Sequence, residues 1–271
     1  MSVVISGTGL FTPPEKISND ELVACFNHYV DKYNDENEQA ILAEEVTALS
    51  HSSSAFIEKA SGIKSRYVMS KADVLNVDVM RPTFVERPNN ELSLQAEVGV
   101  AAAKQAMAAA NKTADDIDLI IVACAYTQRS YPAMAIEIQQ ALGCSGWGFD
   151  MLVACSAATF GIINAANAIR SGTAKTVLVI NPEILSPQIN YRDRDSHFIF
   201  GDVATASIIE DESTATGEHI FKIIAEQPIT QFSNNIRSNI GYMNQCSPAL
   251  ISTLFSKVVR YLKKCYLWYL I

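Results

Sequence analysis

The chain has 271 residues, of which 49% are hydrophobic and 18% charged, and its formal net charge is −8 at pH 7. This composition predicts a soluble globular protein with a substantial core, and the acidic balance argues against a nucleic-acid-binding surface. There is no run of about eighteen uncharged apolar residues, so no membrane-spanning helix is expected.

Strands and helices are predicted to alternate along the chain. The N-terminal segment has no basic region of the kind found in signal peptides, and it is expected to form a strand over Val3–Ile5 that ends in a turn at Gly7-Thr-Gly9. The other expected strands are Leu119–Ala123, Phe149–Ala154, Thr176–Ile180 and Val203–Ile209, and the expected helices are Leu92–Ala110, Pro132–Leu142 and Cys155–Arg170. This alternation indicates an α/β fold with a buried, largely parallel sheet. The polar stretch between about Cys25 and Asn90 is expected to lie over that core as surface helices and loops.

The composition changes near the end of the chain. No Asp or Glu follows Glu226, and from Gln245 onward the only charged residues are basic. Apolar residues between Ile251 and Leu262 have helical spacing, so an amphipathic basic helix could form there and lie on a membrane surface. A helix packed on the body, or a segment that was never selected to fold, are the alternatives that we favour.

Cys155 is the most informative residue. It stands where an apolar strand is expected to run directly into an Ala-rich helix that is closed by Ser171-Gly172. A cysteine in the first turn of a helix lies at the positive end of the backbone dipole, which stabilises thiolate over thiol. The alternative is a small buried hydrophobic residue. None of the six cysteines belongs to a CxxC pair or has zinc-like spacing, which predicts free thiols, no metal site and a reducing cytoplasm.

The Cys155 segment, the strand that follows it and Arg194-Asp-Ser-His-Phe-Ile-Phe-Gly-Asp202 together resemble the β-ketoacyl-acyl-carrier-protein synthase III family of the thiolase-like superfamily. Ser6-Gly-Thr-Gly9, Ala60-Ser-Gly-Ile63 and Ser130-Tyr-Pro132 match further family segments in the same order. The resemblance implies a thiolase-like α-β-α-β-α sandwich, with the N-terminal half present and the C-terminal half mostly missing. The implied domains are residues 1–210, an N-terminal half with inserted polar segments around 25–90, and residues 211–271, a fragment of the second half with an atypical basic tail.

The resemblance also implies an acyltransferase mechanism. The Cys155 thiolate would accept an acyl group from a thioester, and a malonyl group on acyl carrier protein would then lose carbon dioxide and attack the acyl-enzyme. Acyl-coenzyme A and acyl carrier protein would be the substrates and partners, without a further cofactor, and the enzyme would be a homodimer. The pathway implied is fatty acid or related acyl-chain synthesis.

Three other residues match substrate-binding positions of the family. Arg194 matches an arginine at the coenzyme A nucleotide, although an ion pair with Asp193 or Asp195 is the alternative. Tyr131 matches an aromatic residue that enters the partner subunit's acyl pocket, although it could simply be a turn residue before Pro132. Phe56 stands where the family usually has a nucleotide-binding tryptophan, and Ala60 replaces a companion arginine.

The family's later catalytic His and Asn are absent. The four histidines, His28, His51, His197 and His219, do not match the family position, and Asn235 and Asn239 have no histidine before them at a useful distance. These partners supply the hydrogen-bond donors that polarise the malonyl thioester. Two hypotheses therefore remain: a synthase III-type enzyme that is impaired in condensation, or a truncated, catalytically silent remnant that acts at most as a dimerisation or carrier-binding module.

Overall fold

The computed structural model describes residues 2–232, 236–238 and 243–245, which fall into two compact units. The first unit comprises residues 2–13, 85–184 and 202–230, and the second comprises residues 14–84 and 185–201 with the described residues from 231 onward. The boundary predicted at residue 210 falls within a strand of the first unit, and the predicted domain division stays a prediction. The amphipathic tail helix expected between Ile251 and Leu262 lies outside the described residues.

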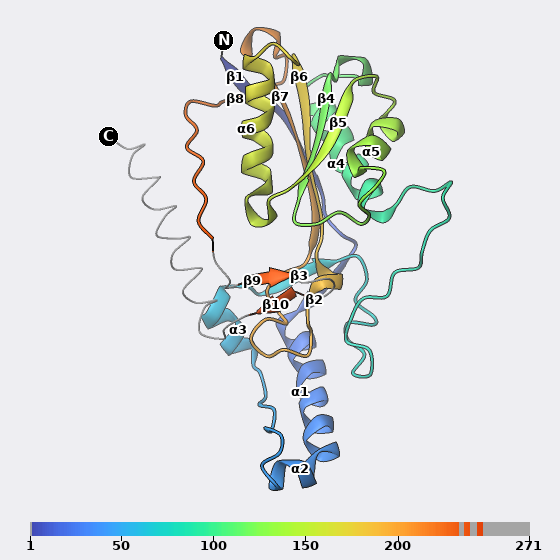
Figure 1. Ribbon diagram of the computed structural model, residues 1–271, viewed down its shortest axis with the longest axis vertical. Helices are drawn as coiled ribbons and strands as arrows, with labels where there is room; N and C mark the ends of the chain where they lie inside the picture. The colour runs from blue at the N-terminus through green and yellow to red at the C-terminus, as the bar shows by residue number, and fades with distance from the viewer. Residues whose placement is uncertain (1, 233–235, 239–242, 246–271) are drawn as a thin grey trace. The chain divides into compact units, whose positions relative to one another are not determined.

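A six-stranded mixed sheet forms the centre of the first unit (Figure 1). Its strands lie in the order β5-β4-β6-β7-β1-β8. They span Val3–Phe11 (β1), Leu119–Cys124 (β4), Trp147–Leu152 (β5), Thr176–Ile184 (β6), Asp202–Asp211 (β7) and Phe221–Lys222 (β8). The α/β fold and the common sheet of the five predicted strands are confirmed. The prediction of a largely parallel sheet is wrong, because only the β4–β5 and β4–β6 pairs are parallel, whereas β7 runs antiparallel to both β6 and β1.

Helices cover both faces of this sheet. Figure 1 shows α6 (Ala157–Arg170) on one face and α4 (Leu94–Ala109) and α5 (Met134–Leu142) on the other. The buried side of α6, which includes Ala165, Ala166 and Ile169, shares an apolar cluster with β4 and β6. Short 3₁₀ turns span Ala114–Asp116, Ala154–Ser156 and Glu212–Thr214. The helix expected after Cys155 is therefore packed on the sheet as predicted, although it begins two residues later than predicted.

The turn predicted at Gly7-Thr-Gly9 is wrong, since these residues lie inside β1. A Cβ atom at Gly7 would collide with the carbonyl oxygen of Ala106, and one at Gly9 with that of Ala102. Both oxygens belong to α4, so the glycines allow that helix to approach the strand backbone closely. The two glycines suggested a turn, but they are needed for the close packing of α4 against β1.

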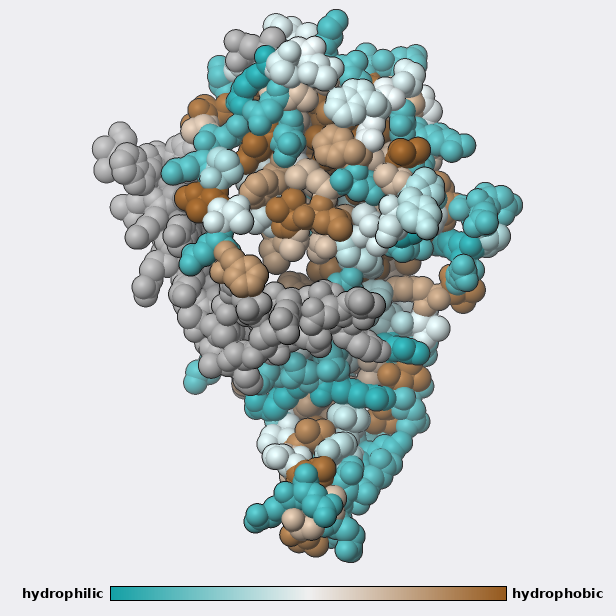
Figure 2. Space-filling model, in the orientation of Figure 1, coloured by the Kyte–Doolittle hydropathy of each residue, from teal (hydrophilic) through white to brown (hydrophobic). Residues whose placement is uncertain are grey.

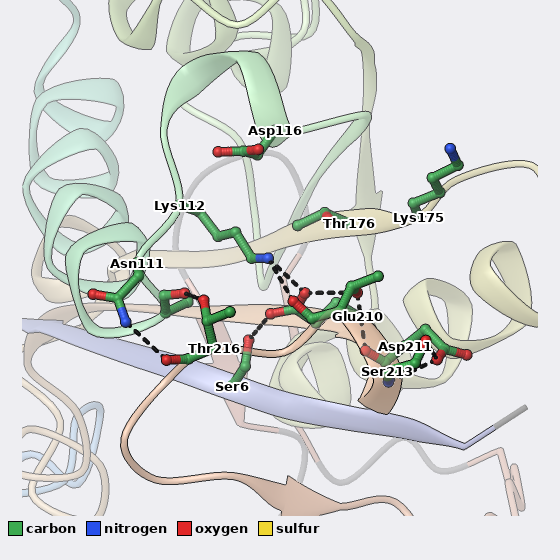
Figure 3. Close-up of polar contacts among 12 residues, drawn as sticks. Ser6, Asn111, Lys112, Asp116, Lys175, Thr176, Glu210, Asp211, Ser213 and Thr216 are labelled. Carbon is green, nitrogen blue, oxygen red and sulfur yellow. Dashed lines mark hydrogen bonds and ion pairs between the residues drawn. The ribbon is translucent and has the colours of Figure 1, made fainter.

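A buried ion pair joins the elements at one end of this unit (Figure 3). Lys112, just after α4, lies 2.8 Å from the carboxylate of Glu210 on β7, and the Glu210 side chain is fully buried. Ser6 on β1 and Thr214 donate hydrogen bonds of 2.5 and 3.0 Å to the same carboxylate. Partners on several sides offset the cost of burying this charge.

The second unit has an apolar core of its own. Its elements are β2 (Glu15–Ser18), α1 (Asn19–Glu36), α2 (Glu38–Leu42), α3 (Ser54–Ser61), β3 (Ser65–Val68), a 3₁₀ turn at Ser186–Gln188, β9 (Ile236–Ser238) and β10 (Met243–Gln245). The buried residues include Leu22, Phe26, Ile57, Tyr191 and Phe198. The region from Cys25 to Asn90, which was expected to form surface helices and loops, thus contributes much of a packed core. Within the described ranges, no helix is long and apolar enough to cross a membrane.

Candidate active site

Cys155 lies on a tight turn between β5 and α6. The strand ends at Leu152, a 3₁₀ turn spans Ala154–Ser156, and α6 begins at Ala157. Ala154 has a φ of 46°, a left-handed conformation that costs a residue with a Cβ about 1–2 kcal/mol. The α-helix does not start at Cys155 as predicted, because Ala154–Ser156 form a 3₁₀ turn before it. The thiol is exposed on the resulting turn.

Backbone hydrogen bonds hold this turn. The Val153 N–H donates to the Cys124 carbonyl at the end of β4 over 3.3 Å, and the Ser156 N–H donates to the Val153 carbonyl over 3.1 Å. Ser156 precedes α6, but its side chain makes no capping hydrogen bond. The Ala157 N–H donates to the Ala154 carbonyl, and the helix end contributes about half a positive charge. An attacking thiolate, or an oxyanion formed from a thioester, would be stabilised there.

The other described cysteines have a different environment. Cys25, Cys124 and Cys144 are buried, and burial raises the pKa of each thiol. The pKa of Cys124 reaches about 12 through burial, with the nearby Glu183 and Asp150 carboxyl groups contributing. These thiols stay protonated at neutral pH and cannot act as nucleophiles.

Tyr131 projects from the loop between β4 and α5, and 85% of its surface is exposed. The Tyr131–Pro132 peptide bond is cis, and α5 begins at Met134 rather than at Pro132 as predicted. The Asp150 carboxylate on β5 accepts hydrogen bonds of 2.7 and 2.8 Å from the backbone N–H groups of Met134 and Ala135. It thereby caps α5 from a neighbouring strand and fixes the end of the loop that carries Tyr131.

A cavity of about 640 Å³ adjoins the same loop. Its lining is mostly polar and includes Arg87, Arg129, Tyr131 and Glu137, but it does not include Cys155. Arg129 pairs with Glu137, and Arg87 pairs with Glu97 at 2.5 Å. Both arginines are therefore already paired with a carboxylate.

Phe56 and Arg194 contact each other in the second unit. The Arg194 guanidinium lies 4.1 Å from the centre of the Phe56 ring. The arginine also donates to the His51 carbonyl over 2.8 Å and lies 3.5 Å from the Asp195 carboxylate. The ion pair weighed as the alternative role of Arg194 is thus present, and the nucleotide-binding role stays a prediction.

His197 is fully buried in the second unit. Its ring stacks on Phe26 with centroids 4.6 Å apart, and Nδ1 lies 3.1 and 2.9 Å from the backbone oxygens of Asp193 and Arg194. Burial lowers the pKa of this imidazole to about 4. The ring is therefore neutral at neutral pH and part of a core.

The family model of 3-oxoacyl-[acyl-carrier-protein (ACP)] synthase III matches residues 149–227, the segment that contains the Cys155 turn. A β-ketodecanoyl-[acyl-carrier-protein] synthase from Pseudomonas aeruginosa is 53% identical over 220 residues, which are 81% of this chain. A β-ketoacyl-[acyl-carrier-protein] synthase III from Granulibacter bethesdensis is 31% identical over 76% of this chain. The crystal structure of 3-oxoacyl-[acyl-carrier-protein] synthase III from Aquifex aeolicus VF5 is 27% identical over 78% of this chain, with a TM-score of 0.58.

The chain belongs to the β-ketoacyl-acyl-carrier-protein synthase III family. It spans 63% of the length of the Pseudomonas relative, 51% of the Granulibacter relative and 54% of the Aquifex chain. The thiolase-like fold expected from the sequence is confirmed for this portion of the family's length.

The structure divides the predicted synthase III site residues between the two units. Cys155 and Tyr131 belong to the first unit, and Phe56 and Arg194, which contact each other, belong to the second. Within the described residues, no group of three or more His, Cys, Asp or Glu side chains is arranged to hold a metal ion.

Two carboxylates near the Cys155 turn were not anticipated from the sequence. Asp150 caps α5, and Glu183 on β6 accepts the backbone N–H of Ala125, the residue that follows β4. Asp150 lies within a predicted apolar strand, whereas Glu183 lies beyond the predicted strand Thr176–Ile180, so the sequence offered a signal only for Asp150. A buried-strand carboxylate needs a partner, but the sequence does not show where in the fold that partner lies.

Proposed function

We propose that Cys155 accepts an acyl group from an acyl-coenzyme A thioester. The thiolate would attack the thioester carbonyl, a new carbon–sulfur bond would form at Cys155, and coenzyme A would leave as its thiol after taking up a proton. The observation that carries this proposal is the exposed thiol on the turn before α6, inside the segment that matches the family model. The position of the thiol before the N-terminus of α6 supports it, since the positive end of the helix would stabilise the oxyanion formed during attack.

The complete reaction of the family would follow from this acyl-enzyme. A malonyl group on acyl carrier protein would lose carbon dioxide, and its carbanion would form a carbon–carbon bond to the acyl carbon and release the Cys155 thiol. The Pseudomonas relative is named a β-ketodecanoyl synthase. Because condensation adds two carbons, we take octanoyl-coenzyme A as the first donor to test. The thioesters carry the activated groups, so the reaction would need no further cofactor in the cytoplasm.

Arg194 and Phe56 would bind the nucleotide end of coenzyme A. Their stacked arrangement offers a planar face to adenine and a positive charge to a phosphate. Substitution of Arg194 should therefore weaken binding of acyl-coenzyme A without abolishing the reactivity of the Cys155 thiol.

Condensation is expected to be slow in this chain. The sequence has no histidine or asparagine that matches the family's later catalytic partners. Loss of one hydrogen-bond donor from a site that stabilises a developing oxyanion costs about a hundred- to a thousandfold in rate. We therefore expect acyl loading with little β-ketoacyl product.

Two measurements test these steps separately. Intact mass after incubation with octanoyl-coenzyme A should increase by one octanoyl group in the wild type and stay unchanged in Cys155→Ser. Transfer of radiolabelled malonyl carbon into a β-ketoacyl product should be close to background in both proteins. An octanoyl adduct on the Cys155→Ser variant would refute the assignment of Cys155 as the nucleophile. Condensation turnover comparable to that of a full-length relative would refute the expectation of slow condensation. No adduct on either protein would favour the silent-remnant hypothesis.

A further inference from the structure

A partly buried carboxylate, Glu183, lies at the end of the sheet where the Cys155 turn is held. Glu183 is near the carboxyl end of β6, next to β4 in the sheet. Its two oxygens lie 2.9 and 3.2 Å from the backbone nitrogen of Ala125, which donates to them. A carboxylate that accepts a backbone N–H forms a charge-assisted hydrogen bond, which is stronger than a neutral one.

The peptide group that Glu183 holds is the same one that holds the Cys155 turn. The amide between Cys124 and Ala125 donates its N–H to Glu183, while its carbonyl oxygen accepts the N–H of Val153 over 3.3 Å. The Val153 carbonyl in turn accepts the N–H of Ser156 over 3.1 Å. Cys155 stands between these two bonded residues. The amide between Cys124 and Ala125 is polarised at its N–H and is therefore a better acceptor at its oxygen, so the bond to Glu183 and the bond from Val153 strengthen one another by about 10–30%.

We propose that Glu183 is a positioning residue for Cys155: its carboxylate fixes the Cys124–Ala125 peptide group, and that peptide group fixes the turn that carries the thiol. The inference rests on the proposed function in one respect, the assignment of Cys155 as nucleophile. Glu183 contacts no reacting atom and acts only through the backbone.

The surroundings of Glu183 make its charge sensitive to pH near neutrality. Burial raises the pKa of Glu183 to about 7 despite the hydrogen bond from Ala125. The titratable groups that interact with it are the Cys124 thiol on β4 and the Tyr126 phenol, and these in turn interact with Asp150 on β5 and Asp202 at the start of β7, respectively. Burial and the Glu183 charge raise the pKa of both Cys124 and Tyr126, so these two stay protonated while Glu183 ionises. Above about pH 7 the anion strengthens the bond to Ala125, and below it protonation weakens that bond.

Amide-proton chemical shifts followed from pH 5.5 to 8.5 test the connection directly. In the wild type, the Ala125 amide proton should move downfield as Glu183 ionises, and the Val153 amide proton should move with the same midpoint. Glu183→Gln keeps an oxygen that accepts the Ala125 N–H but cannot ionise, so both titrations should disappear. Glu212→Gln, which removes an exposed carboxylate paired with Lys222, is the matched control and should leave both titrations in place.

A second readout links the connection to the thiol. The rate of Cys155 acylation by octanoyl-coenzyme A, followed by intact mass over the same pH range, should contain an inflection near neutrality in the wild type that Glu183→Gln lacks. Glu183→Asp moves the carboxylate back by one methylene, so the Val153 amide-proton shift should no longer depend on its ionisation. This change serves as the second variant if Glu183→Gln does not fold.

Some outcomes would overturn the proposal. A pH-dependent shift of the Ala125 amide proton without one at the Val153 amide proton would show that the charge of Glu183 does not affect the turn. Shifts of both amide protons with pH in Glu183→Gln would show that another group is responsible. Identical acylation profiles in the wild type and Glu183→Gln would remove the positioning role. Absence of any Cys155 adduct would instead contradict the proposed function, and the amide titrations would still decide whether Glu183 holds the turn.

Discussion

The thiol of Cys155 differs from the other described thiols in both exposure and neighbours. It is exposed on a turn before α6, whereas Cys25, Cys124 and Cys144 are buried and have raised pKa values. Iodoacetamide reacts with thiolates, so brief labelling at neutral pH should modify Cys155 faster than these three. Peptide mapping after labelling measures the four sites in one experiment.

Labelling of the unfolded protein is the control for this experiment. Unfolding in urea before labelling should abolish the difference between the four cysteines, because the protection of three of them comes from burial. Cys246 and Cys265 lie outside the described residues, and their labelling serves as an internal comparison. Modification of Cys124 or Cys144 in the folded protein, with Cys155 untouched, would contradict the assignment of Cys155 as nucleophile.

His197 is expected to make the protein sensitive to acid. Its native pKa of about 4 lies below the value of about 6.5 for an unfolded histidine, so the unfolded chain binds more protons between these values. The contribution to the free energy of unfolding is complete above about pH 6.5 and is lost as pH falls toward 4, by up to about 3 kcal/mol. His197→Phe keeps a ring against Phe26 and should remove this part of the pH dependence.

Urea unfolding at pH 7.5 and 4.5 measures the difference. The exposed His219 provides the matched control, and His219→Gln should have the same pH dependence as the wild type. If His197→Phe loses as much stability between the two pH values as the wild type, the acid sensitivity comes from other groups.

At the scale of elements, α5 depends on a cap that comes from a strand. Asp150 accepts the N–H groups of Met134 and Ala135, and Ala133, which precedes the helix, makes no side-chain cap. Asp150→Asn keeps one acceptor oxygen but turns an NH₂ group toward the second N–H. This change should lower the free energy of unfolding by about 1–2 kcal/mol.

Hydrogen exchange shows where that loss occurs. The amides of Met134 and Ala135 should exchange faster in Asp150→Asn, while those of β6 stay protected. Asp115→Asn, at an exposed position of a 3₁₀ turn, is the matched control and should change neither the exchange nor the stability. Unchanged exchange at Met134 in Asp150→Asn would mean that the cap is not needed for the start of α5.

The positions of strands and helices were predicted from the sequence more accurately than the burial and neighbours of those elements. The strands that share the sheet and the helix after Cys155 were predicted from apolar runs and from glycines that follow helix ends, which are local signals. Phe149–Ala154 was expected to be covered on both faces, but Leu152 is 60% exposed, and among the described strands β5 pairs only with β4. An apolar run does not reveal whether a strand has one neighbour or two.

Contacts between segments that are distant in the sequence could not be predicted either. Glu183 and Ala125 are 58 residues apart, and nothing in either segment indicates the other. The contact between Arg194 and Phe56 was not predicted, although the family resemblance assigned both positions to one nucleotide site. Long-range pairing depends on the fold as a whole, whereas strand and helix patterns repeat within a few residues.

For the whole molecule, the exposed edge at β5 bears on assembly. Among the described strands β5 pairs only with β4, so its outer edge carries unpaired backbone groups. Figure 2 shows apolar atoms at the surface in the area where Figure 1 labels α6, β4 and β5, and Trp147, Leu152, Tyr131 and Ile136 are each at least 46% exposed. We propose that two copies pair through β5 as a symmetric dimer, as the family resemblance implies.

Light scattering at micromolar concentration should then give about twice the chain mass of 29.6 kDa. Trp147→Glu places a charge on the exposed apolar edge and should shift the protein to the mass of a single chain. Leu42→Glu makes the same kind of change at a leucine in α2 that is 75% exposed, and it should leave the mass of the dimer unchanged. A wild-type protein that is folded by circular dichroism and has the mass of one chain would contradict pairing at β5, because an exposed edge alone would then be tolerated in solution.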